Sequence, residues 1–272
     1  MLGIHLIGRQ GEGGFEFASK MGVKVFQTFL HSPKQLRIVR VNVERWNSEA
    51  EKFPDIIPVV HASYLINPFT DTMAKYQDGF NILLNTMRTA STLDGVDTVV
   101  VHPGALVNLR GSKTSRYEQA ATLFDSVLND PDVYGVRIAL ETMPGAGSQV
   151  AGFAQMHRLY NLIENNDKVG ICWDTAHMVG YGYDLRSESG FDMAVSDFLD
   201  YFSIDDLLVL HLNDTPVRVG SKKDVHTGVQ VNSPPSPMLL RALQQFKGIP
   251  QIVELSDYDT SYRTINTLKN YI

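Results

Sequence analysis

Residues 169–177, VGICWDTAH, begin as an apolar stretch and end with an acid and an imidazole. Val169–Trp173 shows no alternation of polar and apolar side chains, which indicates a strand that is buried on both faces of a parallel sheet. Asp174 and His177 follow where this strand ends. A buried carboxylate costs several kcal/mol unless it is paired or bound to a cation. The stretch therefore predicts a buried parallel strand with a functional group at its end.

Seven other runs of this kind are separated by segments of helical periodicity. The eight predicted strands are LGIHLI (2–7), VKVFQTFL (23–30), IIPVVHASYL (56–65), DTVVVHPG (97–104), VRIALET (136–142), VGICWDTAH (169–177), LLVLHLND (207–214) and PQIVELS (250–256). The predicted helices are Phe15–Met21, Lys34–Glu51, Thr72–Leu93, Ser115–Asn129, Gly152–Asn165, Asp192–Phe202, Pro237–Phe246 and Thr260–Tyr271. Eight alternating units in about 250 residues predict an α/β fold, a (β/α)₈ TIM barrel. The alternative is an open doubly wound sheet, but no glycine-rich phosphate motif follows an early strand.

The composition limits the class of protein. A hydrophobic content of 43% and a charged content of 20% are typical of soluble globular proteins, and no apolar run approaches the ~20 residues that span a membrane. No linker, low-complexity tract or repeat divides the chain, so residues 1–272 are expected to form a single domain. The single cysteine, Cys172, is expected to pack in the core, and no signal peptide is recognisable. We therefore expect an intracellular, reducing compartment (cytoplasm, nucleoid or viral factory) and no secretion.

Six consecutive predicted strands end in a residue that binds metals well. These residues are His61, His102, Glu141, Asp174, His211 and Glu254. A single strand-end histidine or carboxylate more often packs in the core or caps a helix. In a TIM barrel, however, all six would converge on one rim, where three buried carboxylates need a cation. His177 and the pair Asp224 and His226 in SKKDVHTG (221–228) extend the set to nine residues.

Imidazole and carboxylate donors without a thiolate suit Zn²⁺, Mn²⁺ or Fe²⁺, and three or four ligands per ion predict about two or three metals. The net charge of −6 by itself argues against a nucleic-acid partner. Three divalent ions would outweigh the four carboxylates among the ligands, because each ion carries two positive charges. The rim would then attract an anionic phosphate substrate.

The motifs resemble those of the endonuclease IV family of apurinic/apyrimidinic endonucleases over nearly the whole chain. The matching motifs, in the family's order, are HASYLIN (61–67), VHPG (101–104), ETMPGAGS (141–148), DTAHMVGYGYDL (174–185), HLNDT (211–215), DVH (224–226) and VELS (253–256). The resemblance implies a TIM barrel with a trinuclear zinc site at the C-terminal rim. It also implies hydrolysis of the DNA phosphodiester 5′ to an abasic site, which leaves a 3′-hydroxyl and a 5′-deoxyribose phosphate, and removal of blocking groups from 3′ ends.

By position, the resemblance implies three Zn²⁺ ions, with Mn²⁺ or Fe²⁺ able to replace zinc at some positions. The first zinc is assigned to His61, His102 and Glu141. Glu141 bridges to the second zinc, which is completed by Asp174, His211 and Glu254. The third zinc is assigned to His177, Asp224 and His226. Glu141 is also the expected catalytic residue, because its carboxylate can orient the nucleophile.

The resemblance places the DNA-contacting residues on two loops. Tyr64 matches a family tyrosine that enters the duplex at the lesion, although a buried structural tyrosine is the alternative. Lys34 and Gln35 occupy the positions of a penetrating arginine and glutamine, and lysine keeps the charge but loses planar stacking. Further candidates for phosphate contacts are Arg110, Lys113, Arg116, Arg218, Lys222 and Lys223. The expected partner is double-stranded DNA with abasic sites, bound by a monomer that uses no organic cofactor and no membrane.

Two loops depart from the family pattern. LIGRQGEGG (6–14) is longer than usual, and TGVQVNSPPSP (227–237) replaces a glycine-rich stretch, so backbone contacts to DNA from both loops are expected to differ.

Two other functions compete with the nuclease. A sugar isomerase or epimerase of the same barrel superfamily would use one metal and only four of the nine residues, namely Glu141, Asp174, His211 and Glu254. A non-catalytic binding barrel would need none of the nine. The metal content per chain separates the three functions, since it would be near three, one and zero.

Overall fold

The strands close into a barrel. The computed structural model describes residues 1–6, 13–36, 40–106 and 112–272, and in this part of the chain eight parallel strands pair in sequence order, with β1 also paired to β8. The strands are β1 (Leu2–His5), β2 (Val25–Thr28), β3 (Ile57–His61), β4 (Thr98–Val101), β5 (Arg137–Glu141), β6 (Val169–Asp174), β7 (Leu207–His211) and β8 (Gln251–Val253). The closed parallel barrel confirms the predicted fold class and rules out the open sheet.

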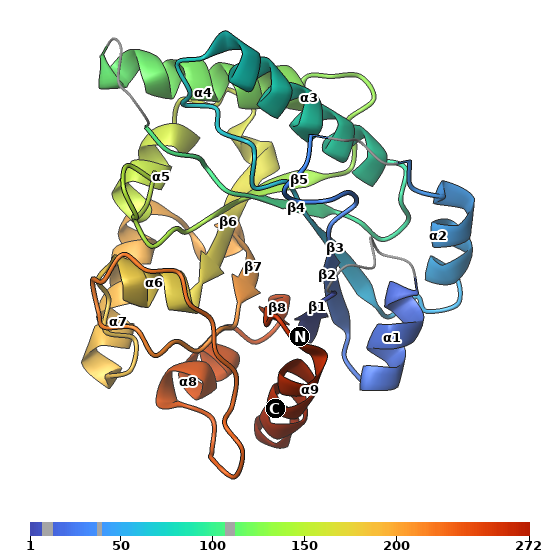
Figure 1. The fold of residues 1–272 in the computed structure, drawn as a ribbon, viewed down its shortest axis with the longest axis vertical. Helices are drawn as coiled ribbons and strands as arrows, with labels where there is room; N and C mark the ends of the chain where they lie inside the picture. Colours follow the sequence, from blue (N-terminus) through green and yellow to red (C-terminus); the bar gives the residue numbers. More distant parts are fainter. Residues whose placement is uncertain (7–12, 37–39, 107–111) are drawn as a thin grey trace.

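Helices surround the strands on the outside of the barrel (Figure 1). They are α1 (Gly14–Met21), α2 (Val43–Ala50), α3 (Met73–Ala90), α4 (Lys113–Leu128), α5 (Phe153–Tyr160), α6 (Thr175–Tyr181), α7 (Glu188–Tyr201), α8 (Pro237–Gln245) and α9 (Tyr258–Leu268). Among the residues that the structure describes, no helix has the length and apolar character needed to cross a bilayer.

One helix prediction needs correction, and one helix of the structure was not predicted. The helix predicted over Lys34–Glu51 begins only at Val43, because the Asn42 side chain accepts a hydrogen bond from the backbone N–H of Arg45 and caps it there. The first residues of the predicted range form a turn, in which the N–H of Gln35 donates to the carbonyl of Ser32. The helix that was not predicted is α6, which begins directly after β6 ends at Asp174. The other predicted helices are present with shifted ends, such as α5, which ends at Tyr160 rather than Asn165.

Alternation along the strands divides the core into two parts. Within β6, Ile171 and Trp173 pack outward against the helices, while Cys172 lies inside the barrel. The barrel interior is filled by Val25, Val59, Val100, Ala139, Cys172, Leu208, Val209 and Ile252. Burial raises the pKa of Cys172 to about 12, so this thiol is a packing residue, as predicted. The same alternation turns Asp174 towards the barrel axis, directly above the apolar interior.

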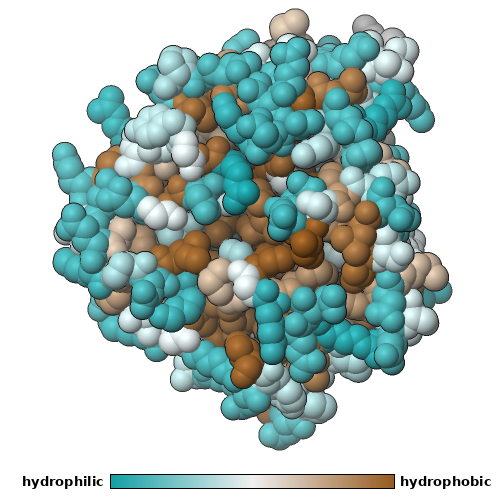
Figure 2. Space-filling view, turned by 180° about the vertical axis from the view of Figure 1, so that it is seen from behind, coloured by the Kyte–Doolittle hydropathy of each residue, from teal (hydrophilic) through white to brown (hydrophobic). Residues whose placement is uncertain are grey.

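Figure 2 shows one face of the molecule, on which hydrophilic residues cover most of the periphery and hydrophobic residues gather towards the middle. Such a surface is ordinary for a globular protein, in which apolar atoms still contribute more than half of the accessible area.

Gly152 supports the helix that carries His177. Its φ is +73°, and a Cβ atom at this position would overlap the ring of Tyr181, the last residue of α6. Gly152→Ala should therefore lower the free energy of unfolding by about 2–4 kcal/mol, because backbone strain of about 1–3 kcal/mol adds to the steric overlap. Urea unfolding measures this loss. Gly135→Ala is the matched control, since Gly135 has a φ of +68° and an added Cβ would meet, apart from its chain neighbours, none of the described residues within 4 Å. Equal losses in the two variants would show that the contact with Tyr181 is unimportant.

Candidate metal centre

The six strand-end residues lie on one rim of the barrel, as predicted. His61, Glu141, Asp174 and His211 are the last residues of β3, β5, β6 and β7. His102 and Glu254 directly follow β4 and β8. The side chains of Asp174 and His211 are completely buried, whereas those of His102 and Glu254 retain 20% and 14% exposure.

The first donor group joins His61, His102 and Glu141. The Nε2 atoms of both histidines lie 3.1 Å from the same oxygen, Oε2 of Glu141. The Nδ1 atom of His61 donates to the carbonyl oxygen of Ala62 at 2.8 Å. A carbonyl can only accept, so Nδ1 carries the proton and the lone pair of neutral His61 is on Nε2, facing Glu141.

The second donor group surrounds Nδ1 of His211. This atom lies 3.2 Å from Oε1 of Glu141, 3.0 Å from Oε2 of Glu254 and 3.8 Å from Oδ2 of Asp174. One ligand atom from each of these four residues lies within 4.8 Å of all the others. Glu141 therefore presents one oxygen to each of the first two groups, which is the arrangement expected of a bridging carboxylate.

The third donor group joins His177, His226 and Asp174, and the more exposed Asp224 lies against both imidazoles. The Oδ1 atom of Asp224 is 3.2 Å from Nε2 of His177 and 3.1 Å from Nε2 of His226. Asp174 Oδ2 is 3.5 Å from Nε2 of His226, so Asp174 faces both the second and the third group. This shared position goes beyond the prediction, which placed Asp174 in the second group alone.

Asp174 also caps the helix that holds His177. Its Oδ1 accepts a hydrogen bond of 2.8 Å from the backbone N–H of His177, at the first turn of α6. The two alternative roles of this carboxylate, cap and metal ligand, are therefore compatible, because each oxygen serves one of them. The cap places the imidazole of His177 one turn beyond the strand, next to the rim.

The donors of the third group fit a cation. Nδ1 of His177 donates to the carbonyl of Thr142 at 2.8 Å, and Nδ1 of His226 donates to the carbonyl of Glu254 at 3.2 Å. Both Nε2 atoms are buried, and neither makes a well-directed hydrogen bond to another described residue despite the nearby Asp224 oxygen. Two converging imidazole nitrogens beside carboxylate oxygens, with no thiolate, form a donor set suited to a divalent metal such as zinc.

The carboxylates of the candidate metal centre favour a positive charge between them. Burial alone would raise the pKa of Glu141, but His211 and His102 hold it well below its ordinary value. Burial alone would lower the pKa of His211 and of His177. The Cys172 sulfur and the carboxylate of Glu254 nevertheless raise the pKa of His211, and Asp174 and Asp224 raise that of His177, well above the ordinary value. Protons on the histidines thus neutralise the nearby carboxylates. A divalent metal ion is also positively charged and can take the place of these protons.

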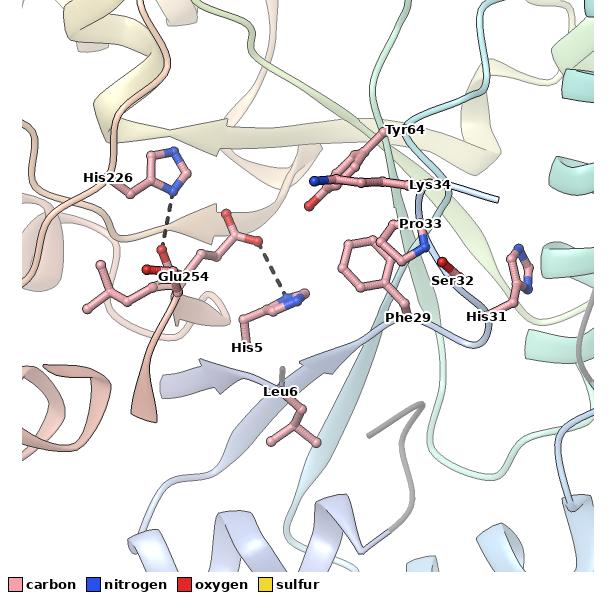
Figure 3. A pocket seen from close by; sticks show the side chains of 12 residues that line it. His5, Leu6, Phe29, His31, Ser32, Pro33, Lys34, Tyr64, His226 and Glu254 are labelled. Carbon is pink, nitrogen blue, oxygen red and sulfur yellow. Dashed lines mark hydrogen bonds and ion pairs between the residues drawn. The ribbon is translucent and has the colours of Figure 1, made fainter. Parts of the chain in front are cut away.

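A pocket of 610 Å³ opens beside the centre (Figure 3). It is lined by His5, Leu6, Phe29, His31, Ser32, Pro33, Lys34, Tyr64, His226, Glu254, Leu255 and Ser256. In Figure 3, Tyr64 and Lys34 face His226 and Glu254 across the pocket, and His5 lies between the two sides. The pocket therefore connects the predicted metal ligands with two of the predicted DNA-contacting residues.

Tyr64 is not the buried structural tyrosine of the alternative interpretation. It is 44% exposed, and its ring stacks on His102 with ring centroids 5.1 Å apart and planes inclined by 24°. Its neighbour Leu65, which the sequence interpretation overlooked, is 41% exposed. Lys34 and Gln35 are exposed on the turn after β2. These side chains thus form an accessible edge beside the pocket.

Of the basic candidates for phosphate contacts, Lys113, Arg218, Lys222 and Lys223 are exposed. Arg116 is buried and donates to the carbonyl of Thr70, which makes it a structural residue and corrects the prediction for this position. Arg110 lies outside the described residues, as does most of the longer loop at 6–14.

Three polar residues of the centre were missed by the sequence interpretation. Asn213, fully buried, donates to Asp174 Oδ2 at 2.8 Å and to Glu254 Oε2 at 3.3 Å. Gln27 and His5 lie near the ends of β2 and β1 and contact each other and Glu254. The signal that identified the other strand ends, a polar residue inside an apolar run, is also present in LGIHLI and VKVFQTFL.

The profile of the xylose isomerase-like TIM barrel family matches residues 15–270. A protein described as probable endonuclease 4 from Halothermothrix orenii is 31% identical over 222 residues, which cover 78% of this chain and 76% of that protein. The crystal structure of endonuclease IV from Thermus thermophilus aligns with a TM-score of 0.82 and 25% identity over 99% of this chain and 98% of that one. The chain therefore belongs to the endonuclease IV family.

The barrel itself is shared more widely. The crystal structure of a D-tagatose 3-epimerase-like protein aligns with a TM-score of 0.74 over 99% of this chain and 96% of that one, at 16% identity. At this identity the likeness concerns the fold alone. The competing functions are therefore distinguished by the donor groups on the rim and not by the barrel.

Proposed function

We propose that the protein is a zinc-dependent endonuclease that cleaves double-stranded DNA 5′ to an abasic site and leaves a 3′-hydroxyl and a 5′-deoxyribose phosphate. It would also remove blocking groups from 3′ ends, and it would act as a monomer without an organic cofactor. One observation carries the proposal: nine donor residues gather in three adjoining groups that share Glu141 and Asp174. Membership of the endonuclease IV family supports the same function.

The three groups would hold three Zn²⁺ ions, and Mn²⁺ or Fe²⁺ also suit these donors. His61, His102 and Glu141 would hold the first ion, Glu141, Asp174, His211 and Glu254 the second, and His177, Asp224 and His226 the third. When bound, the ions supply Lewis-acid stabilisation of the charge on the phosphate and acidify a bound water at neutral pH.

The chain's own residues position this chemistry. Glu141 lies between the first two groups, where its carboxylate can accept a hydrogen bond from the attacking water and align that water with the phosphorus. The carbonyls of Ala62 and Thr142 hold His61 and His177 with Nε2 turned towards the centre. Such hydrogen bonds fix the ring orientation of histidine ligands in advance.

The pocket beside the centre would receive the abasic nucleotide. Its volume of 610 Å³ is within the range of about 300–1,000 Å³ that is usual for small-ligand sites, so a deoxyribose phosphate fits. Tyr64 and Leu65 would enter the duplex where the base is missing, and Lys34 and Gln35 would contact the backbone from the facing turn. The lack of a base makes extrusion of this nucleotide less costly than extrusion of a paired one.

The experiment that tests the function combines an incision assay with metal analysis on one preparation. The protein is incubated with a duplex carrying one tetrahydrofuran abasic analogue, and its metal content is measured by elemental analysis. Incision 5′ to the analogue with about three ions per chain is expected. About one ion per chain without incision would instead support a sugar isomerase or epimerase that uses Glu141, Asp174, His211 and Glu254, and no metal would support a binding protein.

Tyr64→Ala should weaken binding of the abasic duplex by about 10-fold, because base stacking on an aromatic ring contributes about 1–3 kcal/mol. Fluorescence anisotropy measures the affinity, with the Glu141→Gln substitution in every sample to prevent cleavage. Tyr64→Phe keeps the ring and should bind like the parent protein. The proposed role of Tyr64 is wrong if Tyr64→Ala binds as tightly as Tyr64→Phe while retaining the same metal content.

A further inference from the structure

Gln27 is a fully buried amide within the metal centre, and no role in it has been assigned above. It lies on β2, opposite His5 of β1. Its Nε2 atom is 2.6 Å from Oε1 of Glu254 and 2.9 Å from Nδ1 of His5, and its Oε1 atom is 2.9 Å from Nε2 of His211. One amide therefore contacts two expected metal ligands and a residue of the pocket wall.

The partners leave one orientation for the amide. Glu254 would bind a cation as a carboxylate, so its oxygens can only accept hydrogen bonds. The amide nitrogen must then face Glu254, since the flipped amide would place two oxygens 2.6 Å apart. The second N–H of the amide points at His5, whose Nδ1 must therefore be an acceptor.

This orientation determines the tautomer of both histidines. The carbonyl oxygen of Gln27 can only accept, so Nε2 of His211 carries a proton and Nδ1 is the atom available to a metal. Nδ1 of His211 is the atom that faces Glu141, Asp174 and Glu254. Nδ1 of His5 accepts from the second N–H of the amide, which leaves the proton of this imidazole on Nε2.

We propose that Gln27 is a positioning residue of the metal centre, which holds His211 in the Nε2–H tautomer and fixes the carboxylate of Glu254 beside it. The inference rests on the proposed metal-dependent function. One amide thus holds both ligands with Nδ1 of His211 and Oε2 of Glu254 3.0 Å apart, where both would serve the same ion. Partners of this kind typically change metal affinity by about 10–100-fold when removed.

The test compares Gln27→Leu with Gln251→Leu. Both glutamines are buried on barrel strands, but Gln251 begins β8 and donates to the carbonyls of Leu243 and Phe246, away from the metal centre. Zinc affinity is measured by competition with a chromophoric chelator. We expect Gln27→Leu to weaken one zinc site by about 10–100-fold and Gln251→Leu to leave every site unchanged. Equal affinities in Gln27→Leu and the parent protein would overturn the proposal.

A measurement on the unmodified protein decides the proposal even if Gln27→Leu does not fold. Long-range ¹H–¹⁵N spectra of the zinc-loaded, ¹⁵N-histidine-labelled protein report which ring nitrogen of His211 carries the proton. Protonated Nε2 is expected, and a metal-bound Nε2 would overturn the proposal. Neither readout depends on DNA cleavage. Incision by a protein whose zinc affinity is insensitive to Gln27→Leu would disprove only the positioning role, whereas zinc binding without incision would disprove only the nuclease.

Discussion

Glu141→Gln is expected to reduce incision of the abasic duplex by about 10³-fold or more while the protein stays folded. Glu141 offers one oxygen to His61 and His102 and the other to His211. Glutamine keeps the shape but replaces one acceptor oxygen with an N–H₂ group, which cannot bind a cation. Losing a bridging ligand should remove several kcal/mol of transition-state stabilisation, and each 1.4 kcal/mol changes the rate tenfold.

Single-turnover incision at saturating protein measures this effect, with circular dichroism as the check on folding. Glu188→Gln is the matched control, because Glu188 lies exposed on α7 and pairs only with Arg241 among the contacts described for its side chain. That variant should cleave like the parent protein. Incision at the parental rate by Glu141→Gln would refute the assigned role of the bridging carboxylate.

Removal of all metal should produce the other large effect, a loss of incision to background together with a lower melting temperature. Without cations, the buried carboxylates of Glu141 and Asp174 and the partly buried one of Glu254 depend on protonated histidines for their charge balance, as the shifted pKa values of Glu141 and His211 indicate. Binding at about 100 times the dissociation constant stabilises a protein by about 2.7 kcal/mol per site. For a chain of this size, loss of even one site should lower the melting temperature by about 5–10 °C.

Chelation followed by stepwise addition of Zn²⁺ tests this expectation, with incision and thermal unfolding followed on the same samples. Zn²⁺ should restore both, whereas Mg²⁺ should not, because Mg²⁺ prefers oxygen ligands and this centre is rich in imidazole. Full incision by protein stripped of metal would contradict the proposed mechanism as a whole.

The barrel and its rim were predictable because two local patterns coincide. Apolar runs such as Val169–Trp173 identify strands that are buried on both faces, and parallel strands of a barrel end at one rim. A polar residue at the end of each run, such as His61 or Glu141, could then be placed on that rim without any knowledge of distances. The structure confirms this placement for all six strand-end residues.

Two predictions from the sequence were wrong where a single contact decides the local structure. The helix predicted from Lys34 starts at Val43, where the Asn42 side chain accepts a hydrogen bond from the N–H of Arg45, and residues 37–39 of the predicted range lie outside the described residues. Arg116 was counted among the candidates for phosphate contacts, but the packing of α4 buries it against the carbonyl of Thr70. Neither outcome follows from periodicity, because each depends on one particular contact.

The sequence by itself determined which donor atoms the protein carries, their order along the strands, and the end of the barrel at which they meet. Only the tertiary structure decided how they share partners. Gln27 reaches Glu254 because closure of the barrel brings β1 and β8 together, although 227 residues separate the two in the chain. Asp174 likewise faces two donor groups only because α6 and the loop at Asp224–His226 pack beside it. Strand patterns specify direction and register, whereas these distances of a few ångströms depend on packing between distant segments.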